Sequence, residues 1–178
     1  MVLTQAIFQV IWEYRKMIKN IIFLDIDEVL CTNRSRYIYD RTTALDEISC
    51  RFLLKLCEEF NCKIVIHSSW RLYKDGIDLF LEEVNSTLPE LLEYIMDGHK
   101  KRATNPEIYD RLESIDDWLF KYSEEEHVAN FIIIDDYQLE FNKDTEYLMD
   151  SFIKIKNPNI GFDFLEYWAA REMLKEED

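Results

Sequence analysis

Three short, continuous apolar runs determine what this chain can fold into. They lie at residues 21–24, 63–67 and 131–134. Apolar side chains at successive positions, without the alternation of a half-exposed strand, are typical of parallel strands buried on both faces. Each run ends abruptly in small polar or acidic residues. These are Asp25, then Ser68 and Ser69, and finally Asp135 and Asp136. We therefore expect a parallel sheet with its chemistry at the carboxyl ends of its strands.

Helical patterns separate the apolar runs. Apolar side chains recur at helical spacing in residues 45–60 and 76–84. A third helix is expected after Pro106 and through Leu119, with Asn105 as its N-cap and Pro106 as its first residue. These patterns place a helix between each pair of successive strands.

A short strand at residues 151–156 and a final helix at 162–174 continue the order. Strands alternating with helices predict right-handed crossovers and a doubly wound α/β fold, a mainly parallel sheet with helices on both faces. About forty residues separate the first two strand-end motifs, and the segment 71–105 is similarly modest. Neither insertion has room for a full cap domain. Residues 1–178 are thus expected to form a single domain with little or no cap.

The first residues carry a helical pattern of their own. Residues 4–19 have apolar side chains at helical spacing, which predicts an amphipathic helix. A second methionine, Met17, stands just before the first strand. We hypothesise that residues 1–16 are a peripheral appendage or reflect a choice of start site. A secretory signal is not expected, since no basic segment precedes the apolar residues.

Composition excludes several function classes. Only three glycines occur, far apart, so no glycine-rich loop can wrap a phosphate, which excludes P-loop, kinase and dinucleotide-binding proteins. Four cysteines without a C-x-x-C pair and three scattered histidines argue against a zinc cluster and favour reduced thiols in a cytoplasmic protein. No apolar run approaches the ~20 residues of a membrane span. A net charge of -15 repels phosphate backbones, so a long nucleic acid is not an expected partner.

The carboxylates at the expected sheet edge indicate a cation site. Asp25 and Asp27 end one strand, and Asp135 and Asp136 end a neighbouring one. Their mutual repulsion requires a cation among them, and Mg²⁺, which takes a few carboxylate oxygens and a substrate phosphate oxygen, fits best. Asp25 can then attack a phosphorus atom and form an acyl phosphate. Asp27 would protonate the leaving oxygen and later deprotonate the hydrolytic water.

The three strand-end segments resemble the motifs of a known superfamily. FLDIDEVL, KIVIHSSWR and FIIIDDY are similar to motifs one, two and four of the haloacid-dehalogenase-like (HAD) superfamily. The resemblance implies Asp25 as nucleophile, Asp27 as general acid and base that also offers its backbone carbonyl to Mg²⁺, and Ser68 as the phosphate-binding hydroxyl. It also implies Asp136 as a direct metal ligand and Asp135 as a ligand bound directly or through water.

A narrower resemblance extends over most of the chain. SSWR, the pattern R-x-x-x-I-x-x-WL from Arg111 to Leu119, the DD pair and FIKIKNPNIGFDFLEYWAAREML are similar to the HAD branch associated with Swiss Army Knife RNA-repair proteins. This resemblance implies phosphatase-type chemistry more firmly than it implies RNA. The strongly acidic chain has no basic stripe for a large nucleic-acid footprint.

Two positions depart from the family pattern. Glu28 stands where the family usually has glycine after the DxD motif. The basic residue of the third motif, which steadies the nucleophile and the phosphate, is either Arg111 or a member of the cluster Lys100, Lys101 and Arg102. Arg111 opens its helix at a family-like distance before the DD strand.

The residues around Ser68 have several readings. Ser69 is the alternative phosphate-binding hydroxyl. Trp70 is expected in the core rather than as a substrate platform, and His67 is expected to be packed rather than catalytic. Arg71 is expected either to pair with a nearby aspartate or to reach toward a substrate anion.

The leading hypothesis is a Mg²⁺-dependent phosphohydrolase that forms an aspartyl phosphate on a phosphomonoester. A signalling receiver uses similar residues but places its acidic pair first and its lone aspartate later, the reverse of the order here. A non-catalytic phosphate-binding module with a decayed site and a nucleic-acid end-processing phosphatase are the alternatives. The expected partner is a phosphorylated substrate.

Overall fold

The structure, a computed structural model, describes residues 19–175. Its centre is a sheet of four parallel strands in the order β2-β1-β3-β4. The strands are β1 (Lys19–Leu24), β2 (Cys62–Ile66), β3 (Val128–Asp135) and β4 (Phe152–Lys154). Leu24 pairs with Ile66 on one side and with Ile134 on the other, so three strands end at the same level. The residues that follow these strands therefore meet at one edge.

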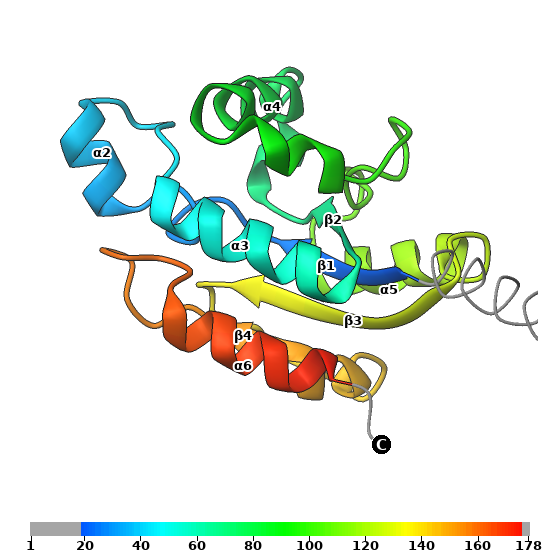
Figure 1. Cartoon of the computed structure of the whole chain (residues 1–178). Coiled ribbons are helices and arrows are strands. Elements are labelled where there is room, and N and C mark those ends of the chain that lie inside the picture. The colour runs from blue at the N-terminus through cyan, green and yellow to red at the C-terminus, as the bar shows by residue number, and fades with distance from the viewer. Residues whose placement is uncertain (1–18, 176–178) are drawn as a thin grey trace, which may run out of the picture.

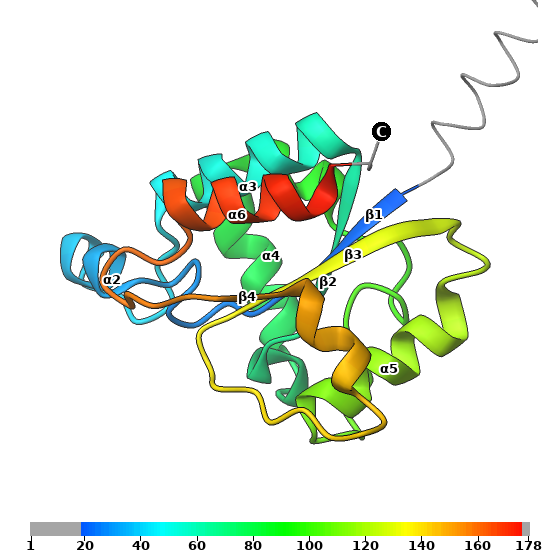
Figure 2. The same ribbon diagram turned by 90° about the horizontal axis from the view of Figure 1, so that it is seen from below.

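Side chains of the central strands pack on both faces of the sheet. Ile22 and Leu24 of β1 point into one core, and Ile21 and Phe23 point into the other, all fully buried. Helices α3 (Glu47–Phe60) and α6 (Phe164–Leu174) cover the first face, whereas α5 (Arg111–Tyr122) covers the second, as Figures 1 and 2 show. The prediction of a doubly wound α/β fold is confirmed.

Helix α5 begins later than the sequence predicts. Its N-cap is Asp110, whose carboxylate accepts a hydrogen bond from the Glu113 backbone N–H at 2.9 Å. Asn105, the predicted cap, instead accepts from the Glu107 N–H at 3.0 Å and closes a turn that contains Pro106. The prediction was wrong because a side-chain turn and a helix N-cap have the same local sequence signature.

Between β1 and α3 lies a short helix that the sequence pattern did not indicate, α2 (Asn33–Tyr39). Its seven residues have no apolar stripe, and a capping box between Thr32 and Ser35 starts it. In Figure 1 it lies beyond the carboxyl ends of the strands.

The other insertion, between β2 and α5, contains α4 (Gly76–Thr87) with 3-10 turns at Ser69–Leu72 and Pro89–Tyr94. A third 3-10 turn, Glu146–Ser151, leads into β4. Within residues 19–175 both insertions are short helices rather than a separate cap domain.

The predicted amphipathic helix at 4–19 and the proposed appendage at 1–16 lie outside the described residues, except that Lys19 opens β1. Among the described helices, none is long and apolar enough to cross a membrane.

Candidate active site

Three carboxylates from the ends of two neighbouring strands converge at the sheet edge. Asp25 follows β1, and Asp135 and Asp136 end β3 and follow it. One oxygen of each lies within 4.8 Å of the others. Asp25 and Asp135 are buried, with 1% and 0% of their surface exposed. The sheet register causes this convergence, because Leu24 and Ile134, the residues just before the carboxylates, are paired.

The electrostatics of this cluster favour a bound cation. Burial, followed by the nearby Asp135 charge, raises the pKa of Asp25. Burial, Asp25 and Asp135 together raise the pKa of Asp136 to about 6. In addition, Asp25 Oδ1 is buried without a hydrogen-bond partner among the described residues. Three hard oxygen donors, one of them unsatisfied, form a ligand set that fits Mg²⁺.

Arg111 is the basic residue that reaches the cluster. At the first position of α5, it donates from Nη1 to Asp25 Oδ2 at 3.1 Å and also to Asp135 Oδ2. Among the sequence alternatives, Lys101 instead pairs with Glu125 at 2.6 Å and with Glu126.

The other two members of that basic cluster have other surroundings. Lys100 is exposed, and the Arg102 carbonyl accepts from the Ile66 N–H at 2.8 Å, beside β2. The structure thus brings Arg111, and not the cluster at 100–102, to the nucleophile candidate.

The buried His67 side chain lies next to Asp135. Its Nε2 lies 3.4 Å from Asp135 Oδ2, and both side chains are fully buried. Burial lowers the pKa of His67. Burial also raises the pKa of Asp135, but His67, Arg111 and the Tyr137 N–H outweigh it and hold that pKa below its ordinary value. The prediction that His67 is packed is confirmed, and its contact with Asp135 is new.

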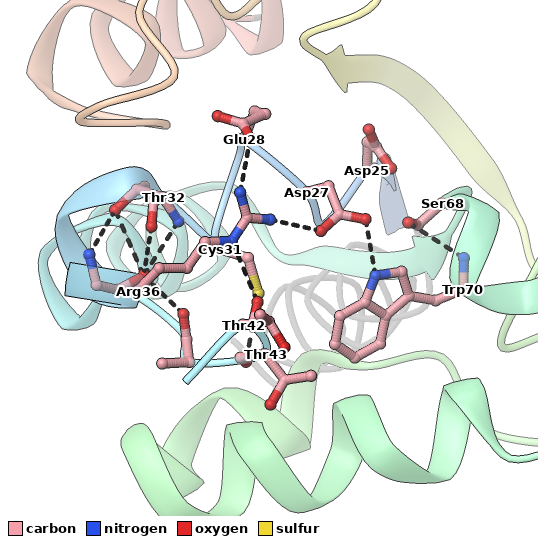
Figure 3. Close-up of polar contacts among 12 residues, drawn as sticks. Asp25, Asp27, Glu28, Cys31, Thr32, Arg36, Thr42, Thr43, Ser68 and Trp70 are labelled. Carbon is pink, nitrogen blue, oxygen red and sulfur yellow. Dashed lines mark hydrogen bonds and ion pairs between the residues drawn. The ribbon is translucent and has the colours of Figure 1, made fainter. Parts of the chain in front are cut away.

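Ser68 ends β2 beside the nucleophile candidate. The residue is fully buried, and its hydroxyl accepts from the Trp70 N–H at 3.4 Å, which starts a 3-10 turn. Figure 3 shows the Ser68 hydroxyl and the Asp25 carboxylate at adjacent strand ends. The hydroxyl is therefore placed where a phosphate attached to Asp25 would need a donor.

The contacts of Arg71 match neither expectation, pairing with a nearby aspartate or reaching toward a substrate anion. Arg71 is 6% exposed, and its guanidinium donates to the carbonyls of His67, Ser68 and Ile108 at 3.3, 3.1 and 2.9 Å. Within residues 19–175 it pairs directly with no aspartate, and it does not project toward solvent. Arg71 instead fixes the backbone that carries Ser68.

The Asp27 carboxylate lies outside the three-carboxylate cluster. Its oxygens accept from Arg36 Nη2 at 2.8 Å and from Trp70 Nε1 at 2.9 Å (Figure 3). The family resemblance implies a metal contact through the backbone carbonyl of Asp27, and this orientation of its carboxylate is compatible with such a contact. Trp70 is 8% exposed and packs against Phe80, as predicted, but its indole N–H also binds Asp27.

Glu28 has a left-handed backbone with φ 60°. Glycine adopts this region without strain, which gives a physical reason for glycine at the corresponding family position. Here Glu28 Oε1 accepts from Arg36 Nη1 at 2.7 Å, whereas its Oε2 is buried with no hydrogen-bond partner in the part of the chain that the structure describes.

A pocket of about 410 Å³ adjoins the cluster through Arg111. Tyr109 and Tyr137 line it, with 81% and 62% of their surface exposed, together with Leu139 and Glu140. The Arg111 guanidinium lies 5.6 Å from the centre of the Tyr137 ring. This pocket offers room for the part of a substrate that lies beyond its phosphate.

A family model described as "HAD domain in Swiss Army Knife RNA repair proteins" matches residues 21–163. No curated protein and no solved structure matches the chain.

Proposed function

The chain belongs to the family of HAD domains in Swiss Army Knife RNA repair proteins, and on that premise we propose that it is a Mg²⁺-dependent phosphohydrolase acting on phosphomonoesters. The observation that carries the proposal is the cluster of Asp25, Asp135 and Asp136, in which Asp25 Oδ1 has no hydrogen-bond partner within residues 19–175. Ser68 and Arg111 beside it supply the hydroxyl and the positive charge that a phosphate needs.

The residues that would hold Mg²⁺ are Asp25, Asp135 and Asp136, with the backbone carbonyl of Asp27. When bound, the ion would neutralise the cluster and withdraw charge from the phosphate oxygens. The remaining chemistry belongs to side chains of this chain.

In the first proposed step, an oxygen of Asp25 attacks phosphorus, and the bond from phosphorus to the leaving oxygen breaks. Asp27, in its protonated form, gives its proton to that oxygen, so the product leaves as a neutral alcohol. In the second step Asp27 removes a proton from water as the water oxygen attacks phosphorus. The bond from phosphorus to the Asp25 oxygen breaks, inorganic phosphate leaves, and the Asp25 carboxylate is restored.

We propose that Arg111 changes hydrogen-bond partners during this cycle. In the free protein its Nη1 is bound to Asp25 and Asp135. A phosphate bound between Ser68 and Asp25 would accept some of the hydrogen bonds of that guanidinium, because its paired N–H groups match phosphate oxygens. We infer that Arg111 stabilises the carboxylates at rest and the phosphate during turnover.

The proposed substrate is a phosphorylated compound. The net charge of -15 disfavours a long nucleic acid, and acidic Glu140 lies in the pocket beside Arg111. A small phosphomonoester or a single phosphorylated end is therefore the better fit. We also propose a cytoplasmic setting, since all four cysteines are free and buried.

The proposal is tested with p-nitrophenyl phosphate and Mg²⁺. Wild-type protein should release p-nitrophenol, and chelation or the Asp25→Asn substitution should abolish release while circular dichroism stays unchanged. A screen of nucleotides, sugar phosphates, phosphopeptides and 3′- or 5′-phosphorylated oligonucleotides then identifies the substrate. Full activity of Asp25→Asn would refute the assignment. Mg²⁺-dependent binding of a phosphate-mimicking fluoride complex, without turnover of any ester, would favour a non-catalytic binding module.

A further inference from the structure

The carboxylate of Asp27 is held from two sides by donors of different elements. Arg36, on α2, donates to Oδ1 at 2.8 Å, and the indole of Trp70 donates to Oδ2 at 2.9 Å. Trp70 itself is 8% exposed and packs edge-on against Phe80, so its indole is a fixed support. The Asp27 side chain is 42% exposed and thus still accessible to a substrate. Figure 3 shows it between the two donors.

Arg36 is itself fixed by further contacts. Its Nη1 donates to Glu28 Oε1 at 2.7 Å, and its Nε donates to the Thr42 carbonyl at 3.1 Å. Three of its nitrogens thus have acceptors, and the guanidinium has one orientation relative to Asp27. Glu28 takes part although its backbone is left-handed, a conformation that is costly for a residue with a side chain.

These contacts restrict the Asp27 carboxylate before any substrate arrives. A proton donor must lie within hydrogen-bond reach of the leaving oxygen, and prior immobilisation removes an entropic cost from the reaction step. We propose that Arg36 and Trp70 are positioning residues that fix Asp27 for proton transfer to the leaving group, with Glu28 orienting Arg36. This inference rests on the role of Asp27 in the proposed function.

A different role for Arg36 predicts the opposite effect. If Arg36 restrained Asp27 in an unproductive orientation, its removal would raise activity. A direct role in binding the substrate phosphate fits less well, because the guanidinium already has acceptors on three nitrogens. The sign of the Arg36→Ala effect therefore separates positioning from restraint.

The experiment compares two esters that differ in how much they need a proton donor. p-Nitrophenolate leaves readily without protonation, whereas phenolate is far more basic. Asp27→Asn sets the scale, and its kcat/KM should fall by about 10²-fold or more for phenyl phosphate, and much less for p-nitrophenyl phosphate. Arg36→Ala and Trp70→Phe should show the same selectivity at about tenfold for phenyl phosphate, since they displace the carboxylate without removing it.

Two further variants complete the design. Arg36→Lys keeps a charge for Asp27 but lacks the fork that also reaches Glu28, so it should restore only part of the phenyl phosphate activity. Arg51→Ala is the matched control, because Arg51 pairs with Glu47 on the exposed surface of α3. It should leave both esters unaffected. An equal loss on both esters in Arg36→Ala, or a gain on either, overturns the positioning role.

A spectroscopic readout does not depend on turnover. The indole ¹H–¹⁵N signal of Trp70, assigned from its loss in Trp70→Phe, reports the hydrogen bond to Asp27. It should shift in Asp27→Asn and in Arg36→Ala and stay in place in Arg51→Ala. If the wild-type protein hydrolyses neither ester, the proposed function fails, and the indole signal then decides alone whether Arg36 positions Asp27. An indole signal that does not shift in Arg36→Ala overturns the inference.

Discussion

The backbone at Gly161 contacts the loop that follows β1 and carries Asp25 and Asp27. Gly161, with φ +65°, packs against this loop, and a Cβ added there would lie 2.3 Å from the Val29 carbonyl oxygen and 2.6 Å from Thr32 Cγ2. The neighbouring Phe162 N–H donates to the same Val29 carbonyl at 2.9 Å. The segment before α6 thus supports the strand-end loop through a contact that only glycine permits.

Gly161→Ala should therefore destabilise the protein more than an equally left-handed glycine in open space. Gly98, with φ +85° and no atom within 4 Å of an added Cβ, is the matched control. Both variants carry backbone strain, and Gly161→Ala should lower the free energy of unfolding by about 1–3 kcal/mol more, as overpacking does. Urea unfolding of the two variants measures the difference. Equal losses would show that Gly161 makes no essential contact.

At the scale of elements, one buried carboxylate joins the starts of two helices. Asp46 caps α3 through the Ile48 and Ser49 N–H groups and also accepts from Thr32, the N-cap of α2. Arg34 of α2 donates to both Asp46 oxygens at 2.6 Å. The position of α2, and with it that of Arg36, therefore depends on Asp46.

Asp46→Asn should lower the free energy of unfolding by about 2 kcal/mol at pH 7, because hydrogen bonds to a charged group are lost. Burial raises the pKa of Asp46, but Arg34 and Thr32 outweigh it and hold that pKa below its ordinary value. A lowered pKa in the folded state means that this stabilisation is complete above about pH 4 and is lost as pH falls through the folded pKa.

Unfolding curves at pH 7 and pH 3 measure this dependence. The gap between wild type and Asp46→Asn should narrow at the lower pH. Glu47→Gln, which alters an exposed carboxylate next in sequence, should show little change at either pH. A gap that is independent of pH would show that the charge of Asp46 does not stabilise the helix starts.

Elements were predictable where a local pattern determines them and not where tertiary contacts do. The continuous apolar runs identified β1, β2 and β3, and with them the meeting of Asp25 with Asp135. The start of α5 was mispredicted because Asn105 and Pro106 imitate an N-cap. Helix α2 was missed because its position depends on Arg34 and Asp46, a contact that no local spacing reveals.

Local sequence patterns also could not predict some contacts of the candidate site. The choice of Arg111 over Lys101 depends on where α5 starts relative to β3, and on the presence of Glu125 and Glu126 beside Lys101. The contacts of Asp27 with Arg36 and Trp70 join three segments that are adjacent only in the fold. The aspartates themselves were predictable because their strands end at the same level.

At the scale of the whole molecule, a net charge of -15 adds to the repulsion among the three converging carboxylates, which favours a bound cation. A ligand that binds only the folded state stabilises it, by about 2.7 kcal/mol at a concentration a hundred times the Kd. Mg²⁺ should therefore raise the melting temperature of the wild-type protein.

Asp136→Asn should abolish this Mg²⁺-dependent increase and, in chelator, should melt above wild type because one of three mutually repelling charges is gone. In chelator, the free energy of unfolding of the Asp136→Asn protein should exceed that of wild type by about 1 kcal/mol. Asp97→Asn makes the same chemical change on an exposed residue and should keep the full Mg²⁺ response. An Asp136→Asn protein that still responds fully to Mg²⁺ would place the ion elsewhere.

The central claim, that Asp25 carries the phosphoryl group during turnover, has a direct test. Wild-type protein mixed with a phosphomonoester and Mg²⁺ is quenched in acid within a single turnover, and its peptides are analysed by mass spectrometry. We expect one phosphoryl group on the peptide containing Asp25 and none after Asp25→Asn. Hydrolysis without any phosphorylated Asp25 peptide, or a phosphoryl group on a different residue, would contradict this account.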